Sequence, residues 1–288
     1  MDIKGLLFKI LTYPLPLRVA IARRMLKKLP LLSYEDRLSI GLTDRQNYGY
    51  CIFQAAKLAT RLEYPRISVI EFGCGGGNGL LSAEAHIAEI MKIFPVEIEL
   101  YGFDAGSGLP NPRDYRDMPY YFKVGLYRMD RQSLERKLER GRLVIGDVSD
   151  TCATFFEKYN PAPIGCMFHD LDFYSSTADA LRILDSDSSH YLPRVFMYFD
   201  DIIGGDLWAC NKFTGERLAI AEFNQKHGAR KICKNYYLPL RYPTASWSHE
   251  VFIYHDFEHP RYNDFIAQED QIAHEKDIRL RSDRAEFA

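Results

Sequence analysis

The fold is decided by one stretch of the sequence, Val69-Ile70-Glu71-Phe72-Gly73-Cys74-Gly75-Gly76-Gly77-Asn78-Gly79. Its apolar first half predicts a strand over 67–72, and the spacing of apolar residues after the glycines predicts a helix over 79–94. Glycine suits a tight turn from strand to helix and lets a ligand approach the backbone closely. The stretch therefore predicts a strand, a glycine loop and a helix, with a ligand site at the loop.

The same alternation of strand and helix continues along the chain. Further strands are expected at 97–103, 142–146, 164–169, 194–199, 229–237 and 248–255. Further helices are expected at 50–62, 178–184 and 216–226, the second of them starting with a capping box of Ser176 and Asp179. Repeated strand–helix units predict an α/β fold with a doubly wound, mostly parallel seven-stranded, Rossmann-like sheet and an antiparallel pair at one edge. Ligands of such a sheet bind beyond the carboxyl ends of its strands.

The two ends of the chain differ in charge from each other. Residues 1–40 hold eight Lys and Arg against three Asp and Glu, whereas residues 256–288 hold nine acidic against five basic residues. We expect a helical, basic N-terminal extension (1–62), the main α/β domain (63–256) and a polar C-terminal tail (257–288). Within the extension, 17–29 is typical of a basic amphipathic helix. It packs on its own domain or on a second subunit of a homo-oligomer, or it contacts a membrane surface; its short apolar face without Trp favours packing.

The composition excludes several classes of protein. The chain has 288 residues, of which 47% are hydrophobic, as in ordinary globular proteins. A formal net charge of −2 argues against a nucleic-acid partner. The six cysteines contain no C-x-x-C pair, so neither a zinc cluster nor a redox motif is indicated. No signal peptide and no transmembrane segment is recognised, so a cytoplasmic location is expected.

The glycine loop does not fit two common nucleotide-binding motifs. A G-x-G-x-x-G motif would need its third glycine at 78, 80 or 82, and no P-loop motif is present. The spacing that fits is an acidic residue followed by G-x-G-x-G, made of Glu71, Gly73, Gly75 and Gly77. This resembles motif I of class I S-adenosylmethionine (SAM)-dependent methyltransferases. The alternative is a glycine turn that only packs the helix on the sheet.

Two further acids strengthen the cofactor hypothesis. Asp104 ends the second predicted strand, where its carboxylate can accept both ribose hydroxyls, and Asp147 ends the third, where it can accept from an adenine amino group. Either of them alone could be a helix cap or a turn residue. Together with Glu71 they place acids at the ends of three successive strands after a glycine loop. A site rich in acids and aromatics also suits the cationic sulfonium of SAM.

A second group of carboxylates follows the fourth and fifth predicted strands. Asp170 follows one strand, and Asp200 and Asp201 follow its neighbour, so the three side chains are expected to converge. Clustered carboxylates repel one another unless they are protonated or share a cation. Oxygen ligands of this kind select Mg²⁺ or another hard divalent cation. The alternative is that one or more of these aspartates caps the next helix.

At these motifs the chain resembles the macrocin O-methyltransferase family, metal-dependent sugar O-methyltransferases of macrolide biosynthesis. The similar stretches are 71–77, 102–110 (like F-D-[ST]-x-x-G-L-P), 170–177 (like D-x-D-x-Y-x-S-T), 200–201 and 215–223. The resemblance implies that Glu71, Gly73, Gly75, Gly77, Asp104 and Asp147 bind SAM, and that Asp170, Asp200 and Asp201 hold a divalent metal, usually Mg²⁺. The chain departs from the family at Ala105, at the turn 188–193 and in the stretch 110–141.

These patterns predict a SAM-dependent, metal-dependent O-methyltransferase that acts on a hydroxyl of a sugar or of a glycosylated small molecule. Asp170 is expected to be both a metal ligand and the nearest base, and Asp172 is the second choice of base. The stretch 110–141 and the loop with Trp208 either cover the acceptor or pack on the sheet. Two other classes stay open: a non-catalytic SAM-binding partner in a glycan or natural-product assembly complex, and a nucleotide-sugar oxidoreductase or epimerase, against which the missing G-x-G-x-x-G motif argues.

Overall fold

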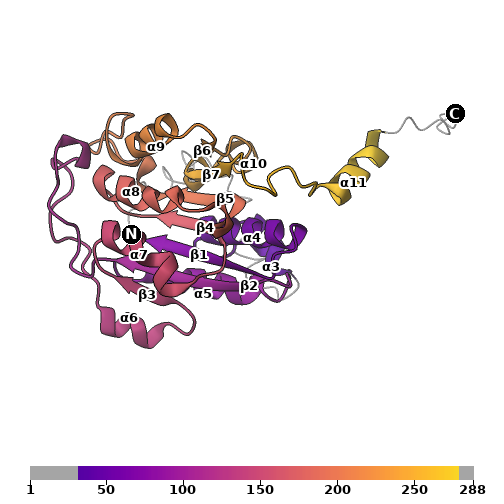
Figure 1. Cartoon of the computed structure of the whole chain (residues 1–288), viewed down its shortest axis with the longest axis horizontal. Coiled ribbons are helices and arrows are strands. Elements are labelled where there is room, and N and C mark those ends of the chain that lie inside the picture. The colour runs from indigo at the N-terminus through magenta and orange to yellow at the C-terminus, as the bar shows by residue number, and fades with distance from the viewer. Residues whose placement is uncertain (1–31, 279–288) are drawn as a thin grey trace, which may run out of the picture.

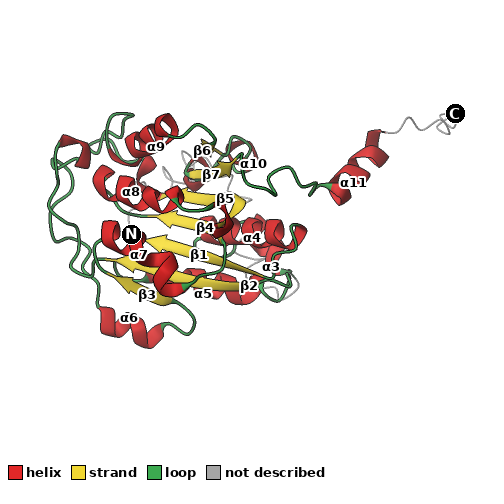
Figure 2. Cartoon of the chain, viewed as in Figure 1, coloured by secondary structure: helices red, strands yellow, loops and turns green. Residues whose placement is uncertain are grey.

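The computed structural model describes residues 32–278, and its centre is a seven-stranded sheet with strand order β3-β2-β1-β4-β5-β7-β6 (Figures 1 and 2). The strands are β1 (Arg66–Phe72), β2 (Glu97–Asp104), β3 (Arg142–Ile145), β4 (Ile164–His169), β5 (Tyr191–Phe199), β6 (Arg230–Lys234) and β7 (Val251–Asp256). Strands β1 to β5 are parallel, and β7 runs antiparallel to both β5 and β6. The mostly parallel seven-stranded sheet with an antiparallel edge is therefore confirmed.

Helices cover both faces of this sheet. They are α3 (Tyr34–Ser39), α4 (Gln46–Arg61), α5 (Asn78–Ile90), α6 (Arg131–Lys137), α7 (Val148–Tyr159), α8 (Tyr174–Leu181), α9 (Gly215–Lys226), α10 (Leu238–Arg241) and α11 (Gln268–Ile278). Helices α4 and α5 share one buried apolar cluster with the sheet, and α7, α8 and α9 share another. Because it is covered on both faces, the central strand β4 is buried at every residue, which explains its continuous apolar sequence.

The start of α8 differs from the sequence-based prediction. The helix begins at Tyr174 after the N-cap residue Phe173, which makes no side-chain capping bond, so the predicted capping box of Ser176 and Asp179 is wrong. A residue far away in the chain replaces it: the Ser175 amide donates to Asp117 Oδ1 over 2.8 Å. Helices α6 and α7 were not predicted from the sequence either. The Thr, Cys and Phe residues of α7 have only modest intrinsic helix propensity, which explains the weak signal there.

The terminal regions are only partly described. The predicted helix 17–29 lies outside the described residues. Helix α4 packs on the sheet inside the apolar cluster of α5, and the expected division of the chain at residue 62 stays a prediction. Helix α11 stands away from the sheet (Figure 1), and its Asp270 pairs with Arg61 of α4 over 2.7 Å. No helix within residues 32–278 is both long and apolar enough to cross a membrane.

Candidate functional site

A cavity of about 710 Å³ opens at the carboxyl ends of the parallel strands. The predicted site residues that line it are Glu71, Gly73, Gly75, Asp104, Asp147, Asp170, Asp172, Asp200 and Asp201. Gly77 is not among the lining residues. It is the N-cap of α5 with a φ of 81°, and a Cβ there would lie 2.3 Å from the side chain of Leu134. Gly77 therefore forms a tight turn beneath the side chain of Leu134, where a larger residue would not fit.

The missing side chains of Gly73 and Gly79 allow two close contacts at the loop. Gly73 has a φ of 83°, and a Cβ on it would lie 1.8 Å from the backbone oxygen of Asp170, so the ends of β1 and β4 meet there without side chains between them. A Cβ on Gly79 would lie 1.9 Å from Oε1 of Glu71. The loop sequence therefore serves both the turn and the placement of the buried Glu71 carboxyl group.

The carboxyl group of Glu71 is hydrogen-bonded to a side chain of α4, the helix directly before β1. Its Oε1 accepts a hydrogen bond of 2.6 Å from the hydroxyl of Tyr48, whose ring stacks on Phe168 at 3.9 Å. The side chain is 1% exposed, and Oε2 has no partner in the described structure. Burial raises the pKa of Glu71 to about 7. One buried acceptor oxygen is thus left for a ligand.

Asp104 and Asp147 use their oxygens differently. Asp104 accepts from the Gly75 amide over 2.9 Å and from the Gly106 amide over 2.5 Å, so it ties the glycine loop to the loop after β2. Asp147 follows β3 and is the N-cap of α7, where Oδ1 accepts from the Ser149 amide over 2.8 Å. Hydrogen bonds from Ser149 lower the pKa of Asp147. Asp147 therefore caps a helix, as the alternative interpretation of the sequence proposed, and it also borders the cavity.

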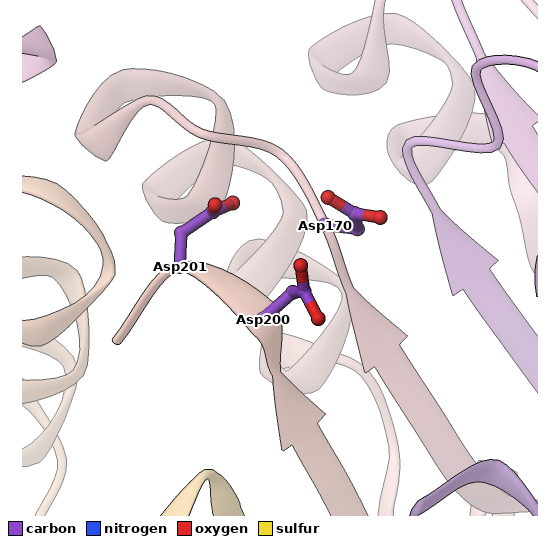
Figure 3. Close-up of side chains that lie close together, drawn as sticks. All are labelled: Asp170, Asp200 and Asp201. Carbon is purple, nitrogen blue, oxygen red and sulfur yellow. The ribbon is translucent and has the colours of Figure 1, made fainter. Parts of the chain in front are cut away.

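Three aspartates converge as predicted. Asp170, Asp200 and Asp201 each offer an oxygen, and these oxygens lie within 4.8 Å of one another (Figure 3). Burial and the neighbouring Asp200 and Asp172 raise the pKa of Asp170 well above its ordinary value, and burial with Asp172 and Asp170 does the same to the pKa of Asp201. Three hard oxygen donors at this spacing fit a divalent cation such as Mg²⁺, which would also offset their mutual repulsion.

Asp172 lies beside this cluster in a left-handed backbone conformation, with a φ of 58°. Its amide donates to Oδ2 of Asp201 over 2.7 Å, which fixes the conformation of the loop after β4. Burial and the nearby Asp200 raise the pKa of Asp172 to about 7. Its carboxyl group therefore lines the cavity in an environment that favours the protonated form.

Three residues outside the predicted site support the cluster. The Tyr198 hydroxyl lies 2.9 Å from Oδ1 of Asp200 and 2.5 Å from Oε2 of Glu250. The amide of Asp201 donates to Glu216 over 3.0 Å, and Glu216 is fully buried with its other oxygen unpartnered. Glu216 lies in a stretch that the family resemblance covers, whereas no motif points to Tyr198 or Glu250.

Aromatic side chains from two loops form one wall of the cavity. Tyr121, from the stretch after β2, stacks on Trp208, from the loop after β5, with ring centroids 5.1 Å apart and an angle of 12°. Phe122 meets the same indole edge-on at 5.1 Å. The Tyr120 hydroxyl donates to the backbone oxygen of Trp208 over 2.9 Å. The stretch 110–141 and the loop with Trp208 therefore contact each other at the cavity wall, and whether they cover an acceptor stays a prediction.

Comparisons with known proteins identify no family for the chain. No protein-family model matches the chain, and no curated protein matches it. Among solved structures, the chain is similar to the calicheamicin methyltransferase CalS11, with 19% identity over 72% of this chain and 83% of that chain and a TM-score of 0.46. It is also similar to the O-methyltransferase NovP, with 15% identity over 73% of this chain and 79% of that chain and a TM-score of 0.49. A third similar structure is that of a putative O-methyltransferase from Klebsiella pneumoniae, with 11% identity over 87% of this chain and 93% of that chain and a TM-score of 0.40.

At these identities, and with TM-scores below 0.5, the likeness defines neither the family nor the activity of the chain. The chain has the seven-stranded, Rossmann-like α/β architecture with helices on both faces that was expected for class I methyltransferases. At such identities the membership of the macrocin O-methyltransferase family stays a prediction. The activity therefore has to be argued from the residues of the cavity.

Proposed function

We propose that the protein is a class I SAM-dependent O-methyltransferase that uses a divalent cation and methylates a hydroxyl of a sugar or of a glycosylated small molecule. One observation carries the proposal: a single cavity joins the acidic glycine loop of β1 to the three-aspartate cluster after β4 and β5. Both halves of a metal-assisted methyl transfer would then share one space. Neither half alone would indicate this reaction.

The cofactor half lies along the ends of β1, β2 and β3. Asp104 is the ribose ligand in this proposal, and Asp147 borders the place of the adenine. Glu71 faces the cavity from the end of β1 with one free oxygen. Bound there, SAM would supply an electrophilic methyl group, and a divalent cation on the aspartates would lower the pKa of a coordinated hydroxyl.

The residues of the chain then have distinct tasks. Asp170, Asp200 and Asp201 hold the cation and so orient the acceptor oxygen toward the cofactor half. Asp170 is the base nearest to both halves, because the backbone after β4 touches the glycine loop at Gly73; Asp172 is the second choice. Tyr121, Phe122 and Trp208 line the cavity, where they can exclude water and pack on the face of a sugar ring.

Cofactor binding is tested by calorimetry with S-adenosylhomocysteine (SAH) and with NAD. We expect the wild type to bind SAH and not NAD. Asp104→Ala removes a charged acceptor and should weaken SAH binding by about 1.5–3 kcal/mol. Asp114→Ala, which removes a half-exposed carboxylate outside the cavity lining, is the matched control. Circular dichroism verifies folding, because Asp104 also ties two loops together. Unchanged SAH affinity in a folded Asp104→Ala variant, or binding of NAD, would contradict the assignment.

The metal is tested separately from the cofactor. We expect Mn²⁺ to bind the wild type, as measured by electron paramagnetic resonance, and Asp200→Asn to lose this binding while it retains SAH. Methyl transfer from labelled SAM to a panel of sugar hydroxyl acceptors should stop in excess chelator and return with Mg²⁺. Undiminished turnover in chelator would remove the metal from the proposal. A protein that binds SAH but no divalent cation would instead fit the non-catalytic SAM-binding partner.

A further inference from the structure

Exposed apolar side chains gather on two loops beside the cavity. Among residues 32–278, sixteen large hydrophobic side chains are exposed, and nine of them belong to the short stretches 115–127 and 203–213. These nine residues form what we call the apolar rim: Tyr115, Tyr120, Tyr121, Val124, Leu126, Tyr127, Ile203, Leu207 and Phe213.

The two stretches lie side by side at the cavity. They follow the parallel strands β2 and β5, whose carboxyl ends lie at the same end of the molecule (Figure 1). The Tyr120 hydroxyl donates to the backbone oxygen of Trp208, and the ring of Tyr121 stacks on the indole of the same residue. Tyr121 and Tyr127 belong to the rim and also line the cavity. The rim is thus one apolar surface next to the cavity, and contiguous apolar patches of this kind mark sites for a partner or a membrane.

Cations lie among these apolar side chains. Residues 119–128 include Lys123 and Arg128 but no acidic residue, and residues 203–213 include Lys212 and one acidic residue, Asp206. The three cationic residues are exposed, and within the described part of the chain they take part in none of the ion pairs. The loops that carry the rim therefore present a net positive charge, in contrast to the acidic cavity behind them.

This combination of side chains fits the surface of a membrane. Leu207 is 87% exposed and Phe213 is 61% exposed, so both can enter the boundary between headgroups and acyl chains. Four of the nine rim residues are tyrosines, whose apolar ring and polar hydroxyl favour a membrane–water interface. The neighbouring cations attract anionic headgroups. A protein seated on the rim would obstruct the path of an acceptor into the cavity, whereas a membrane surface can present one.

We propose that the apolar rim docks the protein on the surface of a membrane that contains anionic lipids, with the cavity facing the headgroups. A sugar carried on a lipid would then reach the aspartate cluster directly from that surface. This choice of acceptor rests on the proposed function, whereas the docking itself does not.

Cosedimentation of the full chain with vesicles tests the docking. The vesicles are made of phosphatidylcholine alone or of phosphatidylcholine with one quarter phosphatidylglycerol. We expect the wild type to bind the mixed vesicles at least about five-fold more strongly, because each cation near an anionic surface adds attraction. Lys123→Gln/Arg128→Gln should reduce this preference for anionic lipid.

Two matched double variants locate the docking surface. Leu207→Ser/Phe213→Ser removes two exposed apolar side chains that do not line the cavity, and it should weaken vesicle binding roughly ten-fold. Its control is Tyr237→Ser/Leu240→Ser at α10, where the lost side chains are 61% and 81% exposed. The control should stay within about two-fold of the wild type. SAH affinity should be unchanged in both double variants.

Tryptophan fluorescence gives a second measurement of the same contact. The chain has two tryptophans, so Trp247→Phe leaves Trp208, which touches the rim, as the only one. Circular dichroism verifies folding, because Trp247 packs against Tyr50 and Tyr242. We expect mixed vesicles that contain brominated lipid to quench the emission of Trp208 more than vesicles without bromine.

The outcomes separate the docking from the proposed function. A wild type that does not bind the mixed vesicles, an equal loss in both double variants, or Trp208 emission that brominated lipid leaves unchanged would each overturn the docking. Unchanged binding in Leu207→Ser/Phe213→Ser would overturn it too and place the membrane contact elsewhere in the chain. SAH binding without vesicle binding leaves the proposed function standing, whereas vesicle binding without SAH binding contradicts the proposed function alone.

Discussion

A single hydroxyl group connects the acidic cluster to the antiparallel edge of the sheet. Tyr198 lies on β5 two residues before Asp200, and its hydroxyl lies within hydrogen-bonding distance of both Asp200 and Glu250. Burial and the neighbouring carboxyl groups raise the pKa of Tyr198, so the hydroxyl keeps its proton and remains a donor. Tyr198 does not line the cavity and acts through Asp200 as a positioning residue.

Tyr198→Phe tests this role, since it removes the hydroxyl and keeps the ring. We expect the affinity for Mn²⁺ to fall by about 0.5–1.5 kcal/mol, because Asp200 loses a hydrogen bond that orients it. SAH affinity should stay unchanged. The control is Tyr174→Phe, which also removes a hydroxyl–carboxylate hydrogen bond, to Glu222 on α9, outside the cavity lining. Equal Mn²⁺ affinities in wild type and Tyr198→Phe would contradict the role, as would an equal loss in both variants.

At the scale of elements, the stretch between β2 and β3 is attached to the start of α8. Asp117 is fully buried, and its carboxyl group accepts from the Ser175 amide, from the Ser175 hydroxyl over 2.9 Å and from the Arg113 amide over 2.7 Å. It thereby satisfies a first-turn amide of α8, which has no side-chain cap of its own. One carboxylate thus supports both the helix and the loop that carries Tyr121 and Phe122 into the cavity wall.

Asp117→Ala should release this loop. Three donors, two of them buried, lose their acceptor, so we expect the free energy of unfolding to fall by roughly 1–3 kcal/mol in urea titrations. Trypsin should cleave faster after Lys123, which lies in the released segment. The control is Asp114→Ala, in which a half-exposed ion pair with Arg116 is lost; its effect on stability should be smaller. If Asp117→Ala and Asp114→Ala both have the stability and the cleavage rate of the wild type, Asp117 does not attach this loop to α8.

At the scale of the whole molecule, the acidic cavity makes stability depend on pH. Burial raises the pKa of Glu71, Asp172 and Glu250 to about 7 each. Between the ordinary carboxyl value and about 7 the native state binds more protons than the unfolded state, so these groups make the metal-free protein less stable as pH rises through that window. Buried His169, whose pKa burial lowers to about 3, acts in the opposite direction over part of the same window.

The clean measurement is therefore the change in Tm that Mg²⁺ causes at each pH, because groups remote from the cation cancel in the difference. Cation binding needs ionised carboxylates, so the stabilisation should grow as pH rises from about 5.5 to about 8. Scanning calorimetry in chelator and in Mg²⁺ measures it. Asp200→Asn should lose the stabilisation at every pH. A Mg²⁺-induced shift that is the same at all pH values would contradict the coupling of cation and protons.

The sequence alone determined the fold class and the position of the candidate site. Apolar runs separated by helical spacing indicated the parallel sheet, and strand β4 was predicted with its observed bounds. Because parallel strands end at one edge of a sheet, the convergence of Asp170 with Asp200 and Asp201 could be predicted from their places after two strands. These inferences succeeded because each of them needs only the order of residues within one strand–loop–helix unit.

Only the tertiary structure decided which residues support these motifs. Glu250 reaches Tyr198 across 52 positions of the chain, and Asp117 reaches Ser175 across 58. Tyr48 contacts Glu71 because α4 packs on the face of the sheet, and no periodicity or motif spacing encodes that contact. Local patterns report which face a residue occupies within its own element. The partner that it meets depends on how separate elements pack, since the partner's apolar surface and hydrogen-bonding groups come from distant parts of the chain.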